Sequence, residues 1–412
     1  MVWALRYTRR MGKAAFWLLW CFVLVLPWDV FGYLPVLGSI PRLVGLVASA
    51  VGILYTLARC RIRPLSPFHV FAGLFVLWAG VSSFWSMDAE ATQTRVLTYL
   101  QLVVLAWLIW EVAWSPARQR ALFQAFVLGE SVSAIVIIHN YLSGVGFNPL
   151  ATLEAARFAA LNQDPNELGL TLALGIPMAW YISLSQPLRR IAWLWQLYLP
   201  LAITAILLTA SRGAFLTTLV GLAIIPWTQE RLRLRAKAAL YTLAVVSLVL
   251  VGSFVPKASL ERLGSTQADI EAGYFGGRGR IWRAGLVVAR EHPIVGVGAG
   301  EFQAALELTG LRERDPHQVL LAILVEDGLV GLGLFLAMVA GAMKPLRHLP
   351  PLQRRFSIVL LLALVVGSFD LSWDHRKQFW FVLGILAAQV VQRRSGRAAP
   401  RTPVVVRTLV TT

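Results

Sequence analysis

Apolar residues in this chain are grouped in long runs that are separated by short polar connections. A helix that crosses a bilayer needs about 20 mostly apolar residues, and about twelve runs come near this length. The pattern therefore predicts an all-α integral membrane protein with one polytopic domain over residues 1–412. We expect spans at Ala14–Gly32, Leu43–Leu57, Phe68–Ser86, Val96–Trp114, Ala121–Ser143, Leu168–Ser185, Ile191–Ala210, Ala214–Trp227, Ala238–Phe254, Val319–Met343, Phe356–Leu371 and Phe379–Val391.

Basic residues gather in every second connection, which is typical of cytoplasmic loops. The first run follows basic residues but no small-residue cleavage site, and further spans come directly after it, so it is not a cleaved signal. This parity places both termini in the cytoplasm, with 393–412 as a cytosolic tail, and residues 255–316 as one long periplasmic loop between spans 9 and 10. The clusters are Arg6/Arg9/Arg10/Lys13, Arg59/Arg61/Arg63, Arg118/Arg120, Arg189/Arg190, Arg231/Arg233/Arg235/Lys237, Lys344/Arg347/Arg354/Arg355 and Arg393/Arg394/Arg397/Arg401/Arg407.

Composition agrees with a membrane protein and excludes an ordinary soluble enzyme. Hydrophobic residues make up 57% of the 412 positions and charged residues only 14%, whereas soluble domains carry about 25% charged residues. The formal net charge of +17 would suggest nucleic acid in a soluble protein. Here most of the basic residues mark the cytoplasmic face, so we expect no nucleic-acid partner.

Several arginines depart from this pattern because they lie on the opposite side. Arg278 and Arg280 follow glycines and precede a helix predicted over Ile281–Arg290. A helix N-terminus attracts anions, and the guanidinium fork matches phosphate oxygens. A flexible glycine-rich turn with solvated arginines is the alternative.

Two shorter connections on that side also carry arginine. Arg212 is the lone charge between two spans, and an arginine at membrane depth normally faces a cavity or a partner. Arg157 precedes the stretch Asn162–Asn166. That stretch equally fits a helix entry in which Asp164 or Asn166 caps the next span.

His317 is the best candidate for a base. We expect Asp315 to cap the helix that follows, with Pro316 at its first position and His317 in its first turn. The positive helix end disfavours an imidazolium, so a neutral ring can accept a proton near pH 7. A capping or interfacial histidine is the alternative, and His375 is the rival base.

Glu326 and Asp327 follow on the same predicted helix. Glu326 should lie about 14 Å below His317 and on the opposite face, so we expect both acids to make structural pairs at mid-membrane. Gly328, Gly331 and Gly333 should let a neighbouring helix approach closely.

Metal and cofactor chemistry finds little support in the sequence. No Cys/His cluster has metal-ligand spacing, and we predict no cofactor and no metal. Asp88 and Glu90 form a weak pattern for a divalent cation, which helix capping explains about as well.

A neutral base beside several arginines at the outer membrane surface suits attack on a lipid-linked diphosphate. The leaving diphosphate gains charge, which fixed guanidiniums stabilise, and the attacking hydroxyl gives its proton to the imidazole. Because no ATP is available on that side, the diphosphate ester must itself be the activated donor.

At these residues the sequence resembles the O-antigen ligase/polymerase superfamily of membrane glycosyltransferases, over roughly Arg157 to Gly333. The similar motifs are an arginine followed by Pro-Asn, a Ser-Arg-Gly turn, a Gly-Arg stretch with tryptophan, and a Pro-x-x-Gly-x-Gly turn. A His-Gln pair followed by Gly-x-x-Gly is associated with the lipopolysaccharide ligase branch. In this chain the motifs are Arg157 with Pro165-Asn166, Ser211-Arg212-Gly213, Gly279-Arg280-Ile281-Trp282, Pro293–Gly298, and His317-Gln318 with Gly328 and Gly331; the tryptophan falls one or two positions early.

The resemblance implies transfer of O-antigen polysaccharide from undecaprenyl diphosphate to lipid A–core, with a GT-C-like architecture in the Gram-negative inner membrane. The reaction would be inverting and metal-independent, and the site would face the periplasm. His317 would be the base, with Arg212 and Arg280 on the diphosphate and Arg157 and Arg278 as helpers.

Other functions remain open at this stage. An O-antigen polymerase shares the arginine and loop pattern. A protein O-oligosaccharyltransferase usually has an extra C-terminal region, which we do not expect in this chain. A transporter of lipid-linked sugars would line a path across the bilayer with charges, whereas here the charges cluster on one face.

Overall fold

The computed structural model describes residues 2–28, 38–146, 157–160, 163–185, 189–229, 278–311 and 315–389. The predicted span Ala238–Phe254, the first part of the long loop including Gly276 and Gly277, and the tail 393–412 lie outside the described residues. The same holds for the Arg231–Lys237 cluster, Asn162, Arg312 and Arg314.

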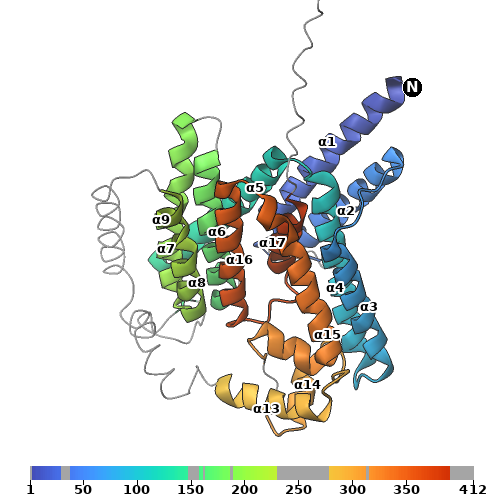
Figure 1. Ribbon diagram of the computed structural model, residues 1–412. Helices are drawn as coiled ribbons and strands as arrows, with labels where there is room; N and C mark the ends of the chain where they lie inside the picture. Colours follow the sequence, from blue (N-terminus) through green and yellow to red (C-terminus); the bar gives the residue numbers. More distant parts are fainter. Residues whose placement is uncertain are drawn as a thin grey trace, which may run out of the picture.

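Every described element is helical, as the pattern predicts (Figure 1). The N-terminal group consists of α1 (Val2–Val25), α2 (Ile40–Arg59), α3 (Pro67–Val81), η1 (Ser82–Phe84), α4 (Ala89–Val112) and α5 (Pro116–Leu142). The central group consists of α6 (Pro165–Ser185), η2 (Arg189–Leu197), α7 (Tyr198–Thr209), α8 (Arg212–Leu222) and α9 (Ile224–Thr228). After the undescribed segment come α13 (Arg278–Glu291), α14 (Phe302–Glu307), α15 (Val319–Met343), η4 (Lys344–His348), α16 (Pro351–Ser368) and α17 (Lys377–Ala388).

Eight helices of the described part are long and apolar enough to cross a membrane, and Arg212–Thr228 and Lys377–Ala388 are shorter apolar helices. The chain is thus a multi-pass membrane protein. Eleven of our predicted spans fall on described helices, while the count of twelve stays a prediction.

Local sequence explains where the spans begin. Proline at the first or second helical position opens α2, α3, α5 and α16, where its missing N–H costs nothing. Asp88 caps α4 by accepting from the amides of Glu90 and Ala91, at 2.9 and 3.1 Å. The geometry therefore accords with the capping interpretation of Asp88.

The core of the bundle is organised around α6, almost all of whose residues are buried, whereas α2 is largely exposed. α6 packs against α5, α7, α8 and α16. Large aromatic side chains fill the neighbouring layer between α3, α4, α15 and α17, with Phe75, Tyr99 and Trp380 fully buried. Helix α13 lies across one end of this bundle, roughly crosswise to the long helices (Figure 1).

The two ends of the bundle differ in charge. At one end, Arg120 donates to the carbonyl of Ser185, and Arg355 donates to the carbonyl of Trp227. Gln119 reaches the carbonyl of Ala388 at the same end. The N-terminal ends of α5 and α16 therefore contact the C-terminal ends of α6, α9 and α17. Basic residues such as Arg120 and Arg355 gather at this end. The chain reaches the opposite end at Pro165, Ser211, Gln318 and Phe369.

Helix α15 departs from our expectation because it is broken at Gly328, which has φ 67° and ψ −166°. The carbonyls of Val325 and Glu326 instead accept from the amides of Val297 and Gly298, at 3.0 and 2.9 Å. Across the break, the amides of Leu329 and Val330 donate to Pro293 and Ile294. A side chain on Gly296 would contact the backbone of Glu326, and one on Gly328 the backbone of Ile294. The Pro293–Gly298 turn and the chain around Gly328 are therefore joined by backbone hydrogen bonds.

This break changes the environment of the two acids. We expected Glu326 and Asp327 on one continuous helix, which is wrong because the first part of α15 ends at Gly328; their depth in the membrane stays a prediction. The predicted close approach at Gly333 is also wrong, since its Cβ position faces open space. Gly331 does lie close to Trp78 of α3, at 3.3 Å from its Cβ position.

Candidate active site at one end of the bundle

His317 lies just before α15, in a backbone conformation that few residues adopt. Its φ of 49° is in the left-handed region, which costs of order 1–3 kcal/mol for a residue other than glycine. Our prediction that Asp315 caps this helix is wrong: α15 begins at Val319, and Gln318 caps it by accepting from the amide of Leu321. His317 is therefore outside the first turn.

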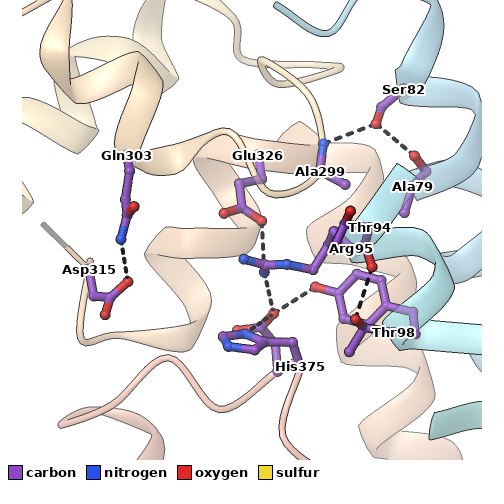
Figure 2. Close-up of polar contacts among 12 residues, drawn as sticks. Ala79, Ser82, Thr94, Arg95, Thr98, Ala299, Gln303, Asp315, Glu326 and His375 are labelled. Atoms are coloured by element: carbon purple, nitrogen blue, oxygen red, sulfur yellow. Dashed lines mark hydrogen bonds and ion pairs between the residues drawn. The ribbon is translucent and has the colours of Figure 1, made fainter. Parts of the chain in front are cut away.

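The residues on the N-terminal side of His317 are held by α13 and α14. Trp282 Nε1 donates to the carbonyl of Pro316 at 3.0 Å. Gln303 Nε2 donates to Asp315 Oδ1 at 2.8 Å (Figure 2). With Gln318 fixed as the helix cap, the main chain is anchored on both sides of the histidine, which accounts for its unusual conformation.

The surroundings of His317 favour its neutral form. Burial of the ring lowers its pKa below the usual value near 6.5, and the charge of Arg278 lowers it further. Asp315, Asp370 and Asp164 oppose this shift but do not outweigh it. A neutral imidazole is the form that accepts a proton, so the ring has the state that a general base needs near pH 7.

Arg278 is brought to His317 by an ion pair. Its guanidinium pairs with Asp370, at the end of α16, and both side chains are mostly buried. The glycine of the Ser-Arg-Gly turn lies against the same acid, because a side chain at Gly213 would contact the Asp370 carboxylate. α8, α13, α15 and α16 therefore meet at this point.

Arg212 is the first residue of α8 and is half-buried. Ser211 caps the helix by accepting from the amide of Ala214 at 3.3 Å. A cation at a helix N-terminus is electrostatically unfavourable, since that end already carries partial positive charge. Free helix amides and a guanidinium both favour an anion, so the position of Arg212 at the start of α8 is compatible with diphosphate binding, which stays a prediction.

Arg157 joins two helix ends. Its Nε donates to the carbonyl of Thr209 at 2.9 Å, and its Nη2 donates to Asn166 Oδ1 at 2.7 Å. Asp164, rather than Asn166, caps α6 by accepting from the amide of Asn166 at 2.7 Å. These contacts give Arg157 a structural role, because it holds the end of α7 directly before the Ser-Arg-Gly turn.

Arg280 stands apart from this group. It lies in the first turn of α13, and its side chain is exposed and makes no hydrogen bond or ion pair with other described residues. The structure thus brings together His317, Arg278 and the Arg212 turn, while it leaves Arg280 at the edge facing outward.

A second polar cluster lies next to the site and was missed in part by the sequence analysis (Figure 2). Arg95 Nη1 lies 3.3 Å from Glu326 Oε2 and 3.2 Å from Asp374 Oδ2. Tyr99 donates to Asp374 Oδ2 at 2.6 Å, and His375 Nδ1 lies 3.4 Å from the same oxygen. Glu326 is thus paired, as expected, although its partner comes from α4.

Asp374 is held in its ionised form by this cluster. Burial alone would raise its pKa, but His375, Arg95 and Tyr99 outweigh that effect and hold the pKa below its usual range. Arg376, two residues on, pairs with Glu167 at the start of α6. The turn between α16 and α17, which also carries Asp370, is therefore fixed to α4, α6 and α15.

Asp370, Arg95 and Asp374 are the residues that sequence reasoning did not find. Asp370 stands alone between apolar residues at the end of a predicted span, and Arg95 lies at the start of another. Isolated charges in such positions normally face a partner or a cavity. This feature of the sequence could have identified Asp370 and Arg95 as candidates for ion pairs.

Residues 197–336 match the O-antigen ligase family model. The resemblance stated from the sequence is thereby confirmed. The matched segment begins just before α7 and ends within α15, so it contains the Arg212 turn, α13, His317 and both glycine motifs. Members of this family are membrane glycosyltransferase-like enzymes, with polysaccharide and lipid substrates. No curated protein matches the chain.

Proposed function

We propose that this protein is an O-antigen ligase, which transfers O-antigen polysaccharide from undecaprenyl diphosphate to a sugar hydroxyl of lipid A–core. The site would face the periplasm from the inner membrane. Support comes chiefly from one observation: a half-buried histidine with a lowered pKa lies beside Arg278 and the Arg212 turn.

In the proposed step, His317 takes the proton of the acceptor hydroxyl while its oxygen attacks the anomeric carbon of the donor sugar. The bond from that carbon to the diphosphate oxygen breaks, and the configuration at the carbon inverts. The leaving undecaprenyl diphosphate gains negative charge, which Arg212 and Arg278 stabilise. We expect Arg280, whose side chain is exposed, to contact the incoming head group from that side.

Asp370 gives Arg278 a defined position, because an ion pair holds the guanidinium close to His317. Arg157 positions the other half of the site through its bond to Thr209, which lies just before the Ser-Arg-Gly turn. Both are positioning roles in the proposed mechanism. We propose that no metal takes part, so full activity should persist in purified protein treated with a chelator.

The deciding experiment is a lipopolysaccharide gel of a strain that lacks this protein. A ligase deletion leaves free core without O-chains, whereas core carrying a single repeat would identify an O-antigen polymerase instead. Unchanged lipopolysaccharide together with altered protein glycans would point to a protein O-oligosaccharyltransferase. Loss of export of the lipid-linked sugar itself would favour a transporter.

The same strain tests the base. Complementation with His317→Ala should give free core only, while the variant is still inserted in the membrane and binds donor. His375→Ala serves as the comparison, because His375 is the rival base and contacts Asp374 rather than the Arg278 group. Normal O-chain ladders from His317→Ala would remove this residue from the mechanism.

A further inference from the structure

Three arginines from separate segments meet at the last turn of α4, at the basic end of the bundle and away from the candidate active site. This arginine cluster consists of Arg59 at the end of α2, Arg63 between α2 and α3, and Arg118 in the first turn of α5. Arg59 Nη2 pairs with Glu111 Oε2 at 2.6 Å. Arg63 Nη1 donates to the carbonyl of Trp110 at 2.9 Å. Arg118 Nη1 donates to the carbonyl of Val112 at 2.7 Å.

Each guanidinium of the cluster also lies over an aromatic ring. The distances from Cζ to the ring centroid are 3.6 Å for Arg63 over Trp110, 5.0 Å for Arg118 over Phe16, and 5.5 Å for Arg59 over Tyr55. A guanidinium in such a position is attracted by the negative face of the ring. The rings and carbonyls therefore hold the three cations in place, but they do not neutralise their charge.

The cluster has more positive than negative charge. Among the described residues, Glu111 is the one carboxylate that forms an ion pair with it, and Glu111 also accepts from the amide of Arg63 at 2.6 Å. All three arginines are half-buried. Burial lowers the pKa of Arg63, an effect that Glu111 opposes and the charge of Arg59 reinforces. Like charges away from bulk water repel one another strongly, so a further anion against the cluster would be favourable.

Apolar surface is exposed directly beside these cations. Leu57, Ile62 and Leu65 are 65%, 67% and 54% exposed, and each lies within two positions of Arg59 or Arg63 in the chain. A small soluble anion would leave this surface in contact with water. The acyl chains of a phospholipid would cover it while the phosphate meets the guanidiniums, so the surroundings favour a lipid as the source of the anion.

We propose that the arginine cluster binds the phosphate of an anionic phospholipid in the leaflet at this end of the bundle, which we predict to be the cytoplasmic one. Guanidiniums match phosphate oxygens in shape and charge, and basic pockets between membrane helices bind such head groups. A zwitterionic phospholipid suits the cluster less, because its ammonium group would meet the surplus of positive charge. The site goes beyond the proposed function and does not depend on the donor or acceptor of the reaction.

Arg63→Gln and Arg118→Gln each remove one charge from the cluster. Arg120→Gln is the matched control, because Arg120 lies two positions from Arg118 on the same helix, is also half-buried, and also donates to a carbonyl, that of Ser185 at 3.1 Å. Binding of phosphatidylglycerol and of phosphatidylcholine to each purified full-length protein in detergent is measured by native mass spectrometry.

The unmodified protein should bind phosphatidylglycerol more tightly than phosphatidylcholine. Each cluster variant should bind phosphatidylglycerol about fivefold more weakly, which is the loss expected for one basic residue at an anionic lipid surface. Arg120→Gln should bind both lipids as the unmodified protein does. The proposal is wrong if the unmodified protein does not distinguish the two lipids, or if the control loses as much affinity as the cluster variants.

Thermal unfolding separates lipid binding from a purely structural role of the cluster. A ligand that binds the folded state raises the Tm, so phosphatidylglycerol should raise the Tm of the unmodified protein and of Arg120→Gln, and raise that of the cluster variants less. If the cluster only holds the end of α4, the variants would start from a lower Tm but gain the same rise, which would overturn the proposal. An equal rise with inorganic phosphate would also overturn it, since the site would then bind a soluble anion.

Discussion

His317 takes its acid–base behaviour from its burial first and from charged neighbours second. Arg278 lowers its pKa, while Asp315, Asp370 and Asp164 raise it, and burial is the largest effect of all. Each neighbour can be changed separately, so the direction of each contribution is open to measurement through the acid limb of the pH–rate profile.

Activity should fall as the pH falls through the pKa of His317, because the protonated ring cannot accept a proton. Arg278→Gln removes a charge that lowers this pKa, so the acid limb should move to higher pH. Asp370→Asn removes a charge that raises it, so the limb should move to lower pH. Profiles of kcat for the purified variants check the signs, and movement of both limbs in one direction would contradict the assignment.

Between elements, the joint of α15 with the Pro293–Gly298 turn depends on two glycines. Gly328→Ala should prevent folding or abolish transfer. Its φ of 67° with ψ of −166° lies in a region that essentially only glycine adopts, at a cost of order 1–3 kcal/mol for other residues, and its Cβ would contact the backbone of Ile294. Gly333→Ala is the control on the same helix, where a Cβ meets open space.

The control variant should be as stable as the unmodified protein or more stable by up to about 1 kcal/mol, because alanine is the better helix former. Thermal unfolding in detergent and O-chain ladders in cells measure both variants. Equal behaviour of Gly328→Ala and Gly333→Ala would show that the joint has no special requirement for glycine.

Arg95 connects three elements through buried carboxylates. Arg95→Met leaves Glu326 and Asp374 without their shared cation, and loss of one partner of a buried ion pair costs about 3–5 kcal/mol. A large decrease in Tm is therefore expected. Arg61→Met, at an exposed position between α2 and α3, should change the Tm little. Similar Tm values for the two variants would mean that the cluster contributes nothing to stability.

For the whole molecule, orientation in the membrane is the first quantity to test. In a background without Cys21 and Cys60, Arg290→Cys on the exposed side of α13 should react with a membrane-impermeant reagent added outside the inner membrane. Arg61→Cys should react only after the membrane is opened. Reversal of this pattern would place the candidate site in the cytoplasm and exclude the proposed donor and acceptor.

Sequence patterns were sufficient for the helical class and for the positions of the described spans, because runs of apolar residues reflect the bilayer directly. The Ser-Arg-Gly turn and His317 were also recognisable, since a polar side chain at the end of a span is seldom there for apolar packing. Asp370, Arg95 and Asp374 were not found, because their partners are distant in sequence: Arg278 and Asp370 are 92 positions apart, and Arg95 and Asp374 are 279 apart.

The break in α15 was missed for a different reason. Gly328 lies in an apolar stretch that is long enough to be a single span, and glycine is frequent in membrane helices. The broken form is favourable because another segment supplies hydrogen-bond partners, namely the amides of Val297 and Gly298 and the carbonyls of Pro293 and Ile294. The hydrophobic pattern along the chain does not reveal hydrogen bonds between two separate segments.

The same break also bears on the bilayer around the protein. From Leu329 to Met343, α15 is only about 22 Å long, and the twelve residues of α17 give about 18 Å, whereas the hydrocarbon layer is about 30 Å thick. This hydrophobic mismatch should thin the bilayer beside the two helices. Transfer should then be faster in vesicles of short-chain phosphatidylcholine than in vesicles of long-chain phosphatidylcholine. The opposite order would exclude this thinning as a contribution to activity. Thinning there would bring the outer lipid surface, and any head group within it, down to the level of His317.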